Sequence, residues 1–350
     1  MTLLDHPYEP PSAATPDGAP GAGREPVGLP VVDNHGDDAL VALLPPDGVA
    51  IGSPEFVQAA GRAGRLLSEP VHDALCDFAD HGSDAGALLL KGMPVGRFGP
   101  TPSSPRAATD KDHVSELVLL SVARRLGQPV GYAPEHGGDV VQNLLPTADD
   151  VGRQTSTSSG VELAFHTETA FHPHKPRFLL LLCLRVEPTA QTLLTSIRQV
   201  ADRLTPTARQ ALREPRFRTS ADESFRDHQD GTVSGTTPPR PWVSEPVPVL
   251  GGTTEAPTFT FDADLMVGVD EEAADALEEL RVLVHDAHVG VALDAGDLMV
   301  VDNAVAVHGR SAFPARFDGT DRWLQRTFVV PDLAPSADER QGRVITTRFA

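Results

Sequence analysis

Apolar residues in the first part of the chain recur at helical spacing. Across residues 54–80 this spacing predicts two helices that are divided at Pro70. Residues 87–95 (ALLLKGMPV) form a short apolar run closed by turn residues, which is typical of a buried strand. Residues 113–132 predict an amphipathic helix that ends near Gly127, because glycine favours the end of a helix.

Beyond this helix the pattern changes to short apolar runs separated by glycine, proline and polar turn residues. The runs are VVQNLLP, FLLLLCLR, TLLTSI, TFTFDADLM, VGVALDAGDLMVVDN and WLQRTFVV. Many short strands with this punctuation predict a β-sandwich or barrel with helices packed outside it. Residues 201–214 and 271–288 have helical spacing and are expected to be inserts. The expected fold class is therefore mainly β with flanking helices.

Two segments lack a periodic pattern. Residues 1–45 are rich in Pro, Gly, Asp and Ala, and they are predicted to form a disordered arm before a single domain of residues 46–350. Residues 219–257 are polar and rich in Gly and Pro. Loops of that length are usually functional or disordered, so a lid over a site is expected here.

Composition narrows the possible partners. The net charge of −20 repels phosphate backbones and anionic membranes, so neither nucleic acid nor a membrane is expected as a partner. No apolar run approaches the ~20 residues that span a bilayer, and the first residues lack the basic flank of a signal peptide. The two cysteines, Cys76 and Cys183, have no CxxC partner, which argues against disulfides and a cysteine-based zinc site. A cytoplasmic protein is predicted, and its oligomeric state is left open.

Metal-binding residue types gather in AFHTETAFHPH, residues 164–174. On an extended strand His166 and Glu168 project to the same face, where both can bind one ion. His308, which follows a strand-like run, offers a third ligand, whereas His172 and His174 lie at a proline bend and are not expected to be ligands. Two histidines and a carboxylate form the facial triad of non-haem Fe(II) oxygenases. Zinc is the alternative, although the HExxH motif of zinc hydrolases is absent.

The motifs around these candidates resemble a known enzyme family. HTETAFHPHKPRFLLLLCLR, GDLMVVDNAVAVHGRSAF and RFDGTDRWLQRTFV are similar to segments of the clavaminate synthase-like Fe(II)/2-oxoglutarate-dependent oxygenases. Within that family the chain resembles hydroxylases of free arginine, asparagine and lysine. The resemblance begins at about residue 85. It implies a double-stranded β-helix (jelly roll) core, Fe(II) as the metal, and 2-oxoglutarate and O2 as cosubstrates.

The resemblance also implies roles for particular residues. The three candidate ligands match the iron ligands of the family. Arg322 matches the arginine that binds the far carboxylate of 2-oxoglutarate, a role that suits the bidentate fork of a guanidinium. Thr192 matches a threonine that assists this arginine, with Thr195 as the alternative.

Further positions match residues that hold the substrate. They are Arg326, Glu135, Asp262, Asp264, Asp222 and Ser224. By resemblance Arg326 meets the α-carboxylate and Glu135 lies near the α-amino group. The aspartates of FDADLM contact the far end of the side chain, and the residues of ADESF belong to the lid. Each has a structural alternative: an ion pair for Arg326, a surface turn for Glu135, and a cap for the FDADLM aspartates.

The predicted function is hydroxylation of a free L-amino acid, at C3 or else at C4. Two carboxylates at one end of a pocket favour a basic substrate such as arginine or lysine, because a buried cation needs a counter-charge. The neutral ureido group of citrulline also fits. The alternatives are the same chemistry on a carrier-tethered or peptide residue, desaturation, a non-catalytic metal-binding jelly roll, and a zinc hydrolase. Arg326 argues against a tethered carboxylate, and Arg322 argues against a mere metal site.

Overall fold

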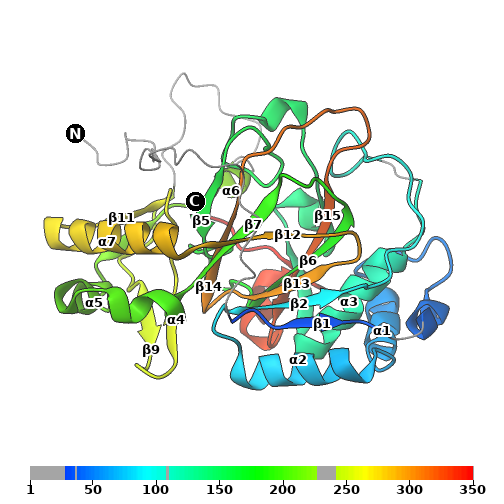
Figure 1. Ribbon diagram of the computed structural model, residues 1–350, viewed down its shortest axis with the longest axis horizontal. Helices are drawn as coiled ribbons and strands as arrows, with labels where there is room; N and C mark the ends of the chain where they lie inside the picture. Colours follow the sequence, from blue (N-terminus) through cyan, green and yellow to red (C-terminus); the bar gives the residue numbers. More distant parts are fainter. Residues whose placement is uncertain (1–27, 36–37, 108–109, 227–241, 350) are drawn as a thin grey trace.

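Two sheets form the centre of the molecule, and most of the helices lie outside them (Figure 1). The computed structural model describes residues 28–35, 38–107, 110–226 and 242–349. The larger, nine-stranded sheet has the order β1 (Val31–Asp33), β2 (Ala87–Lys91), β13 (Leu298–Asp302), β6 (Phe178–Arg185), β15 (Trp323–Val330), β3 (Gln128–Tyr132), β17 (Val344–Ile345) and β16 (Arg340–Gln341), with β4 (Gln142–Leu144) also paired to β15.

The second sheet and two small ladders complete the strands. The four-stranded sheet has the order β12 (Val289–Ala292), β7 (Gln191–Ser196), β14 (Ala306–Arg310) and β5 (Leu163–His166). The ladders pair β9 (Leu250–Gly252) with β10 (Pro257–Phe259) and β8 (Phe217–Thr219) with β11 (Met266–Gly268).

The helices are about as prominent as the strands. The α-helices are α1 (Pro54–Ala63), α2 (Glu69–His81), α3 (Val114–Leu126), α4 (Ile197–Val200), α5 (Pro206–Leu212), α6 (Glu223–Arg226) and α7 (Glu271–Ala287). Short 3-10 turns are η1 (Asp38–Leu43), η2 (His136–Gly138), η3 (Ala148–Asp150), η4 (Ala201–Arg203) and η5 (Ala334–Glu339). The fold is therefore mixed helix and sheet, whereas the expected class was mainly β with flanking helices.

Two helices were expected across residues 54–80, and both are present, but the break lies before Pro70. Ser53 caps α1 through a hydrogen bond from the backbone N–H of Phe56. Pro70 lies in the first turn of α2, where a missing N–H costs nothing because it would have no helical partner. The proline starts the second helix and does not separate the two.

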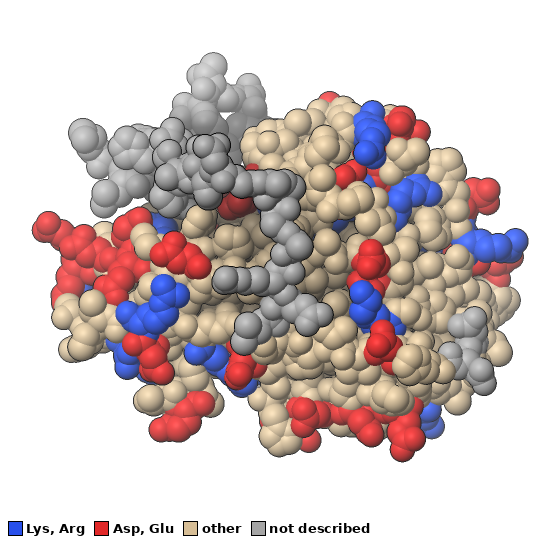
Figure 2. All heavy atoms as spheres, viewed as in Figure 1, with Lys and Arg blue, Asp and Glu red and all other residues tan. Residues whose placement is uncertain are grey.

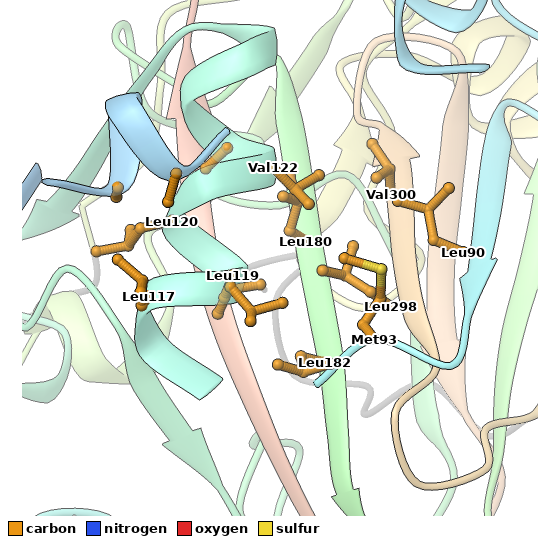
Figure 3. Close-up of a cluster of buried hydrophobic side chains, with 14 of the residues drawn as sticks. Leu90, Met93, Leu117, Leu119, Leu120, Val122, Leu180, Leu182, Leu298 and Val300 are labelled. Carbon is orange, nitrogen blue, oxygen red and sulfur yellow. The ribbon is translucent and has the colours of Figure 1, made fainter. Parts of the chain in front are cut away.

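The helix α3 is buried along most of its length, which corrects the amphipathic helix expected there. Ten successive residues from Val114 to Ala123 are buried. The helix packs on β15 and β6, and its side chains share a cluster with leucines of β6, β13 and β2 (Figure 3); α1 packs on it as well. The helix ends at Gly127, as predicted.

The expected disordered arm is too long at its C-terminal end. The described residues 28–35 and 38–45 belong to the folded part: Val31 and Val32 of β1 pair in parallel with Leu89 and Leu90 of β2, and Leu40 is buried. A strand of three residues is too short to show a periodic pattern, so β1 could not be predicted. Residues 1–27, and the centre of the expected lid at 227–241, lie outside the described residues.

Acidic side chains gather at the end of the molecule formed by α7 (Figure 2). This helix carries Glu271, Glu272, Asp275, Glu278 and Glu279. None of the helices in the described part of the chain is long and apolar enough to cross a membrane.

A buried ion pair connects α3 to the strand that carries the candidate arginines. Lys111 and Glu116 form a salt bridge, with side chains that are 2% and 5% exposed. Glu116 also accepts a hydrogen bond of 2.9 Å from Gln325 of β15. Burial alone raises the pKa of Glu116, but the bonds from His113 and Lys111 outweigh it and lower this pKa to about 2. The ionised glutamate therefore fixes α3 against β15.

We expect Glu116→Gln to destabilise the protein by about 3–5 kcal/mol at pH 7, because it leaves Lys111 buried without its charge partner. The ordinary pKa of Glu116 is 4.5 and its folded value is about 2, so its charge stabilises the fold above pH 4.5. This contribution fades as the pH falls from 4.5 toward 2, and the difference between the two proteins should shrink with it. Urea unfolding at several pH values measures this, with the exposed Glu55→Gln as control. An equal difference at every pH contradicts the assignment.

Candidate active site

The antiparallel pairing of β5 with β14 brings the two candidate histidines together. His166, the last residue of β5, lies directly opposite His308 of β14, and their ring centroids are 4.4 Å apart. Glu168 follows β5, and its Oε2 lies 3.4 Å from Nε2 of His308. One ligand atom from each of the three residues lies within 4.8 Å of the others. In the described part of the chain they form the one such group of three.

The backbone of Glu168 is held by an asparagine that the sequence analysis missed. The N–H of Glu168 donates to Oδ1 of Asn303 at 2.7 Å, and Nδ2 of Asn303 donates to the carbonyl of Glu168 at 3.1 Å. The next residue, Thr169, has a φ of +50°, which is unusual for a threonine. The tight turn after the glutamate is thus stabilised from the loop before β14. A carboxamide far away in the sequence gives no pattern that predicts this contact.

The surroundings of the three side chains suit the binding of a divalent metal. Burial raises the pKa of Glu168, but the charge of Arg326 and the bond from His308 outweigh it and lower the pKa to about 2. Burial lowers the pKa of His308 to about 4, so its ring is neutral. The Nδ1 of His166 lies 2.8 Å from the carbonyl of Ala164, which can only accept, so Nδ1 carries the proton and Nε2 is left to bind a metal. One carboxylate and two imidazole nitrogens are a ligand set that fits Fe(II).

The candidate ligands lie in the wall of a cavity of about 650 Å³. Every other site residue proposed from the sequence also lines it: Arg322, Thr192, Arg326, Glu135, Asp262, Asp264, Asp222 and Ser224. The alternative to Thr192, Thr195, does not line the cavity, and its hydroxyl donates to the carbonyl of Val284 at 2.7 Å. Thr192 is therefore the threonine that can act beside Arg322.

Arg322 is a buried cation. In the part of the chain that the structure describes, its one hydrogen bond is a 3.4 Å contact from Nη2 to the hydroxyl of Thr192. Among the described residues no carboxylate forms an ion pair with it. Burial lowers its pKa to about 10, so the guanidinium remains charged at neutral pH. A buried charge left alone is costly, and this site is complete only when an anion binds there.

Arg326 has the opposite character, because it is fully engaged by the protein. It forms ion pairs with Glu135 and, at 3.3 Å, with Glu168, and its Nε and Nη2 donate to Oε1 of Gln142 at 2.9 and 2.6 Å. Gln142 of β4 is its cross-strand neighbour. Glu135 is buried rather than placed in a surface turn, and burial raises its pKa. The Oε2 of Glu135 has no hydrogen-bond partner in the described protein. Arg326 therefore forms the ion pair considered as its structural alternative, and it also lines the cavity.

The two aspartates of FDADLM differ from each other. Oδ1 of Asp262 accepts from the backbone N–H groups of Asp264 and Leu265 at 2.9 and 2.7 Å, which is the capping role considered above. Asp262 is also buried beside His166, to which it is joined by an isolated β-bridge. Asp264 is exposed at the edge of the cavity. Asp262 therefore caps a turn through its Oδ1 and also lines the cavity.

His172 and His174 do not belong to the metal-binding group, in agreement with the sequence analysis. His172 is 1% exposed, and its ring lies 4.9 Å from the ring of Tyr132. Its Nδ1 accepts a hydrogen bond of 2.9 Å from the N–H of His174. The second half of AFHTETAFHPH has a packing role.

Another arginine in the cavity wall escaped the sequence analysis as a site residue. Arg310 is 5% exposed, and it donates to Oγ of Ser158 at 2.7 Å and to the carbonyl of Val161 at 3.1 Å. Segment 150–157, which precedes these partners, also lines the cavity with six of its residues. Arg310 lies two positions after His308 on β14, so strand alternation offered a signal for it. The 150–157 segment has no such signal.

The triad, the cavity and the unpaired Arg322 define the class of site found in mononuclear non-haem iron oxygenases. The comparisons with known proteins identify the family. The model described as "Taurine catabolism dioxygenase TauD, TfdA family" matches residues 84–328. The chain belongs to this family.

Characterised relatives are similar over most of the chain. L-lysine 3-hydroxylase of Catenulispora acidiphila is 36% identical over 299 residues, which are 85% of this chain and 82% of that enzyme. L-asparagine oxygenase of Streptomyces coelicolor is 37% identical over 294 residues, which are 82% of this chain and 84% of that enzyme. A solved asparagine oxygenase with Fe(II), 3-hydroxyasparagine and succinate superposes with a TM-score of 0.80 and 34% identity. The match covers 90% of this chain and 98% of that enzyme. The oxygenase OrfP with Fe, succinate and (3S)-hydroxy-L-Arg superposes with a TM-score of 0.77 and 27% identity. The match covers 91% of this chain and 100% of OrfP.

We expect Asn303→Ala to weaken metal binding about 10- to 100-fold, because residues that orient metal ligands have effects of this size. Titration with Fe(II) without oxygen, or with Co(II), measures it. The matched control is Asn34→Ala, which removes an asparagine that bonds Gly92 and Ser68 instead. Unchanged metal affinity in Asn303→Ala shows that Glu168 needs no such support.

Proposed function

We propose that the protein is an Fe(II)- and 2-oxoglutarate-dependent oxygenase that hydroxylates the side chain of a free L-amino acid. Its relatives include a 3-hydroxylase of lysine and an asparagine oxygenase whose structure contains a 3-hydroxylated product. These relatives favour C3 as the position, with C4 second. The two sheets are proposed to form the double-stranded β-helix of the family, within a single domain.

The observation that carries this proposal is Arg322, a charged guanidinium that has no ion-pair partner among the described residues and lies in the same cavity as the metal-binding group. His166, Glu168 and His308 would hold the iron. Arg322, assisted by the hydroxyl of Thr192, would bind the far carboxylate of 2-oxoglutarate and so orient the cosubstrate toward the metal. Iron with this cosubstrate supplies the activation of dioxygen, and a non-catalytic metal site would not need the arginine.

The other end of the cavity fits the charged groups of an amino acid. Arg326 would receive the α-carboxylate, in competition with Glu135, which is its partner in this structure. A Glu135 released in this way would face the α-ammonium with a carboxylate oxygen, Oε2, that has no hydrogen-bond partner among the described residues. The need for both charges favours a free amino acid over a carrier-linked or peptide residue.

The far end of the side chain is proposed to meet acidic groups. Asp262, Asp264, Asp222 and Ser224 line the cavity, which favours a basic side chain such as that of arginine or lysine. The ureido group of citrulline also suits carboxylate acceptors. The proposed lid, residues 219–257, contributes Asp222 and Ser224 from its first described residues.

The direct test is a screen of free L-amino acids, including ornithine and citrulline, with Fe(II), 2-oxoglutarate and oxygen. We expect a gain of one oxygen atom in one or a few basic amino acids, with one succinate formed per product, detected by mass spectrometry. Reaction only with peptides or carrier-linked residues contradicts the substrate proposal. Loss of two hydrogens would indicate desaturation instead.

We expect Arg322→Met to raise the KM for 2-oxoglutarate by about 10- to 100-fold, because a charge-assisted hydrogen-bond pair is removed. The KM for the amino acid should change little. Arg343→Met is the control, since this arginine is also partly buried but does not line the cavity. An unaltered KM for 2-oxoglutarate excludes Arg322 as its anchor.

A further inference from the structure

Beside the metal-binding segment lies a cluster of aromatic side chains that no step above uses. We call it the aromatic cluster, and its members are Tyr132, Phe171, His172, Phe225, Trp242 and Phe349. Their ring centroids lie 4.8–6.4 Å apart in tilted and edge-to-face pairs. Such pairs add specific geometry to the burial of apolar area.

The cluster joins segments that are distant in the sequence. Phe171 follows the turn of Glu168, Phe225 belongs to α6, and Trp242 is the first described residue after the gap at 227–241. Phe349, the last described residue, contacts Phe171, Trp242 and Phe225 at 4.9, 4.8 and 6.0 Å. Figure 1 shows α6 near the C-terminal end of the chain, in agreement with these contacts.

The helix α6 depends on this cluster for its position. It has four residues, too few for a helix that is stable by itself. Its Phe225 is 5% exposed within the cluster, whereas Ser224 of the same helix and Asp222 just before it line the cavity. A backbone hydrogen bond of 3.2 Å from Ala221 to Trp242 connects the two sides of the gap. Displacing Phe225 would therefore displace residues of the cavity wall.

His172 acts in the cluster as a neutral aromatic ring. Burial lowers its pKa to about 3, so it carries no charge at neutral pH. Its ring also lies 5.2 Å from that of Phe349. The hydroxyl of Tyr132 donates to the carbonyl of His174 at 2.7 Å, which fixes the bend after the metal-binding turn. Tyr132 therefore connects the aromatic cluster to this bend.

We propose that the aromatic cluster positions α6 at the cavity, and that Phe349 is a positioning residue for binding of the amino acid. Phe349 links the segment that follows Glu168 to Phe225 and Trp242. This inference rests on the proposed function, because it takes Asp222 and Ser224 as neighbours of the substrate. Arg322 and the metal ligands lie outside the cluster, so binding of iron and 2-oxoglutarate is independent of Phe349.

The test is Phe349→Ala, with Phe349→Tyr as the conservative variant and the exposed Phe317→Ala as the matched control. We expect the KM for the amino acid to rise on the order of tenfold in Phe349→Ala, since misplaced positioning groups have effects of this kind. More succinate should form per hydroxylated product, and the dissociation constants of Fe(II) and 2-oxoglutarate should stay unchanged. Phe349→Tyr should restore the KM. A parallel loss of iron and 2-oxoglutarate binding indicates general destabilisation and overturns the proposal.

A second measurement needs no substrate. The chain has two tryptophans, and Trp323 is fully buried in the core, so a change in emission reports Trp242. We expect a red shift in Phe349→Ala, together with faster hydrogen exchange at residues 221–226. Unchanged emission and exchange overturn the anchoring of α6 even if substrates react normally. A shifted emission with an unchanged KM overturns the link to substrate binding. Absence of any amino-acid substrate for the unaltered protein overturns the proposed function and, with it, the role of Phe349 in substrate binding, but not the anchoring.

Discussion

The pairing of β5 with β14 is the contact on which the whole site depends. It sets His166 opposite His308, and a shift of one residue in its register would turn one of these side chains to the other face of the sheet. The loop before β14 also supplies Asn303, which holds the backbone of Glu168. One strand pair with its preceding loop therefore places all three candidate ligands. The same strand continues to Arg310, which fixes part of the cavity wall.

Arg322 and Arg326 show how two similar side chains of one cavity can differ in their partners. Arg322 has one long hydrogen bond and no carboxylate partner among the described residues, so a bound anion would stabilise it. Arg326 is surrounded by Glu135, Gln142 and Glu168, so a ligand carboxylate must share or replace an existing partner. The first arrangement suits a cosubstrate that binds in every cycle. The second suits a substrate that is recognised by exchange of partners, which favours selectivity over affinity.

Local patterns in the sequence predicted what local physics controls. Strand alternation pointed to His166 and Glu168, but the extended strand expected there ends at His166 and Glu168 lies in the turn that follows. Helical spacing placed α1, α2, α3 and α7. Other contacts join segments that are distant in the sequence, and no periodic pattern predicts them. They are the contacts of Asn303, of Gln142 and of the aromatic cluster. The burial of α3 on more than one side and the short β1 are likewise products of tertiary packing. The roles of the arginines came from family resemblance, because one arginine looks like another until its partners are known.

The central claim is that iron and 2-oxoglutarate bind together in this cavity. Titration of the Fe(II)-loaded protein with 2-oxoglutarate under anaerobic conditions, followed by visible absorption, tests it most directly. The account predicts a weak charge-transfer band that saturates with one 2-oxoglutarate per iron and is missing in Glu168→Ala. A protein that binds both Fe(II) and 2-oxoglutarate yet shows no such band would contradict the account.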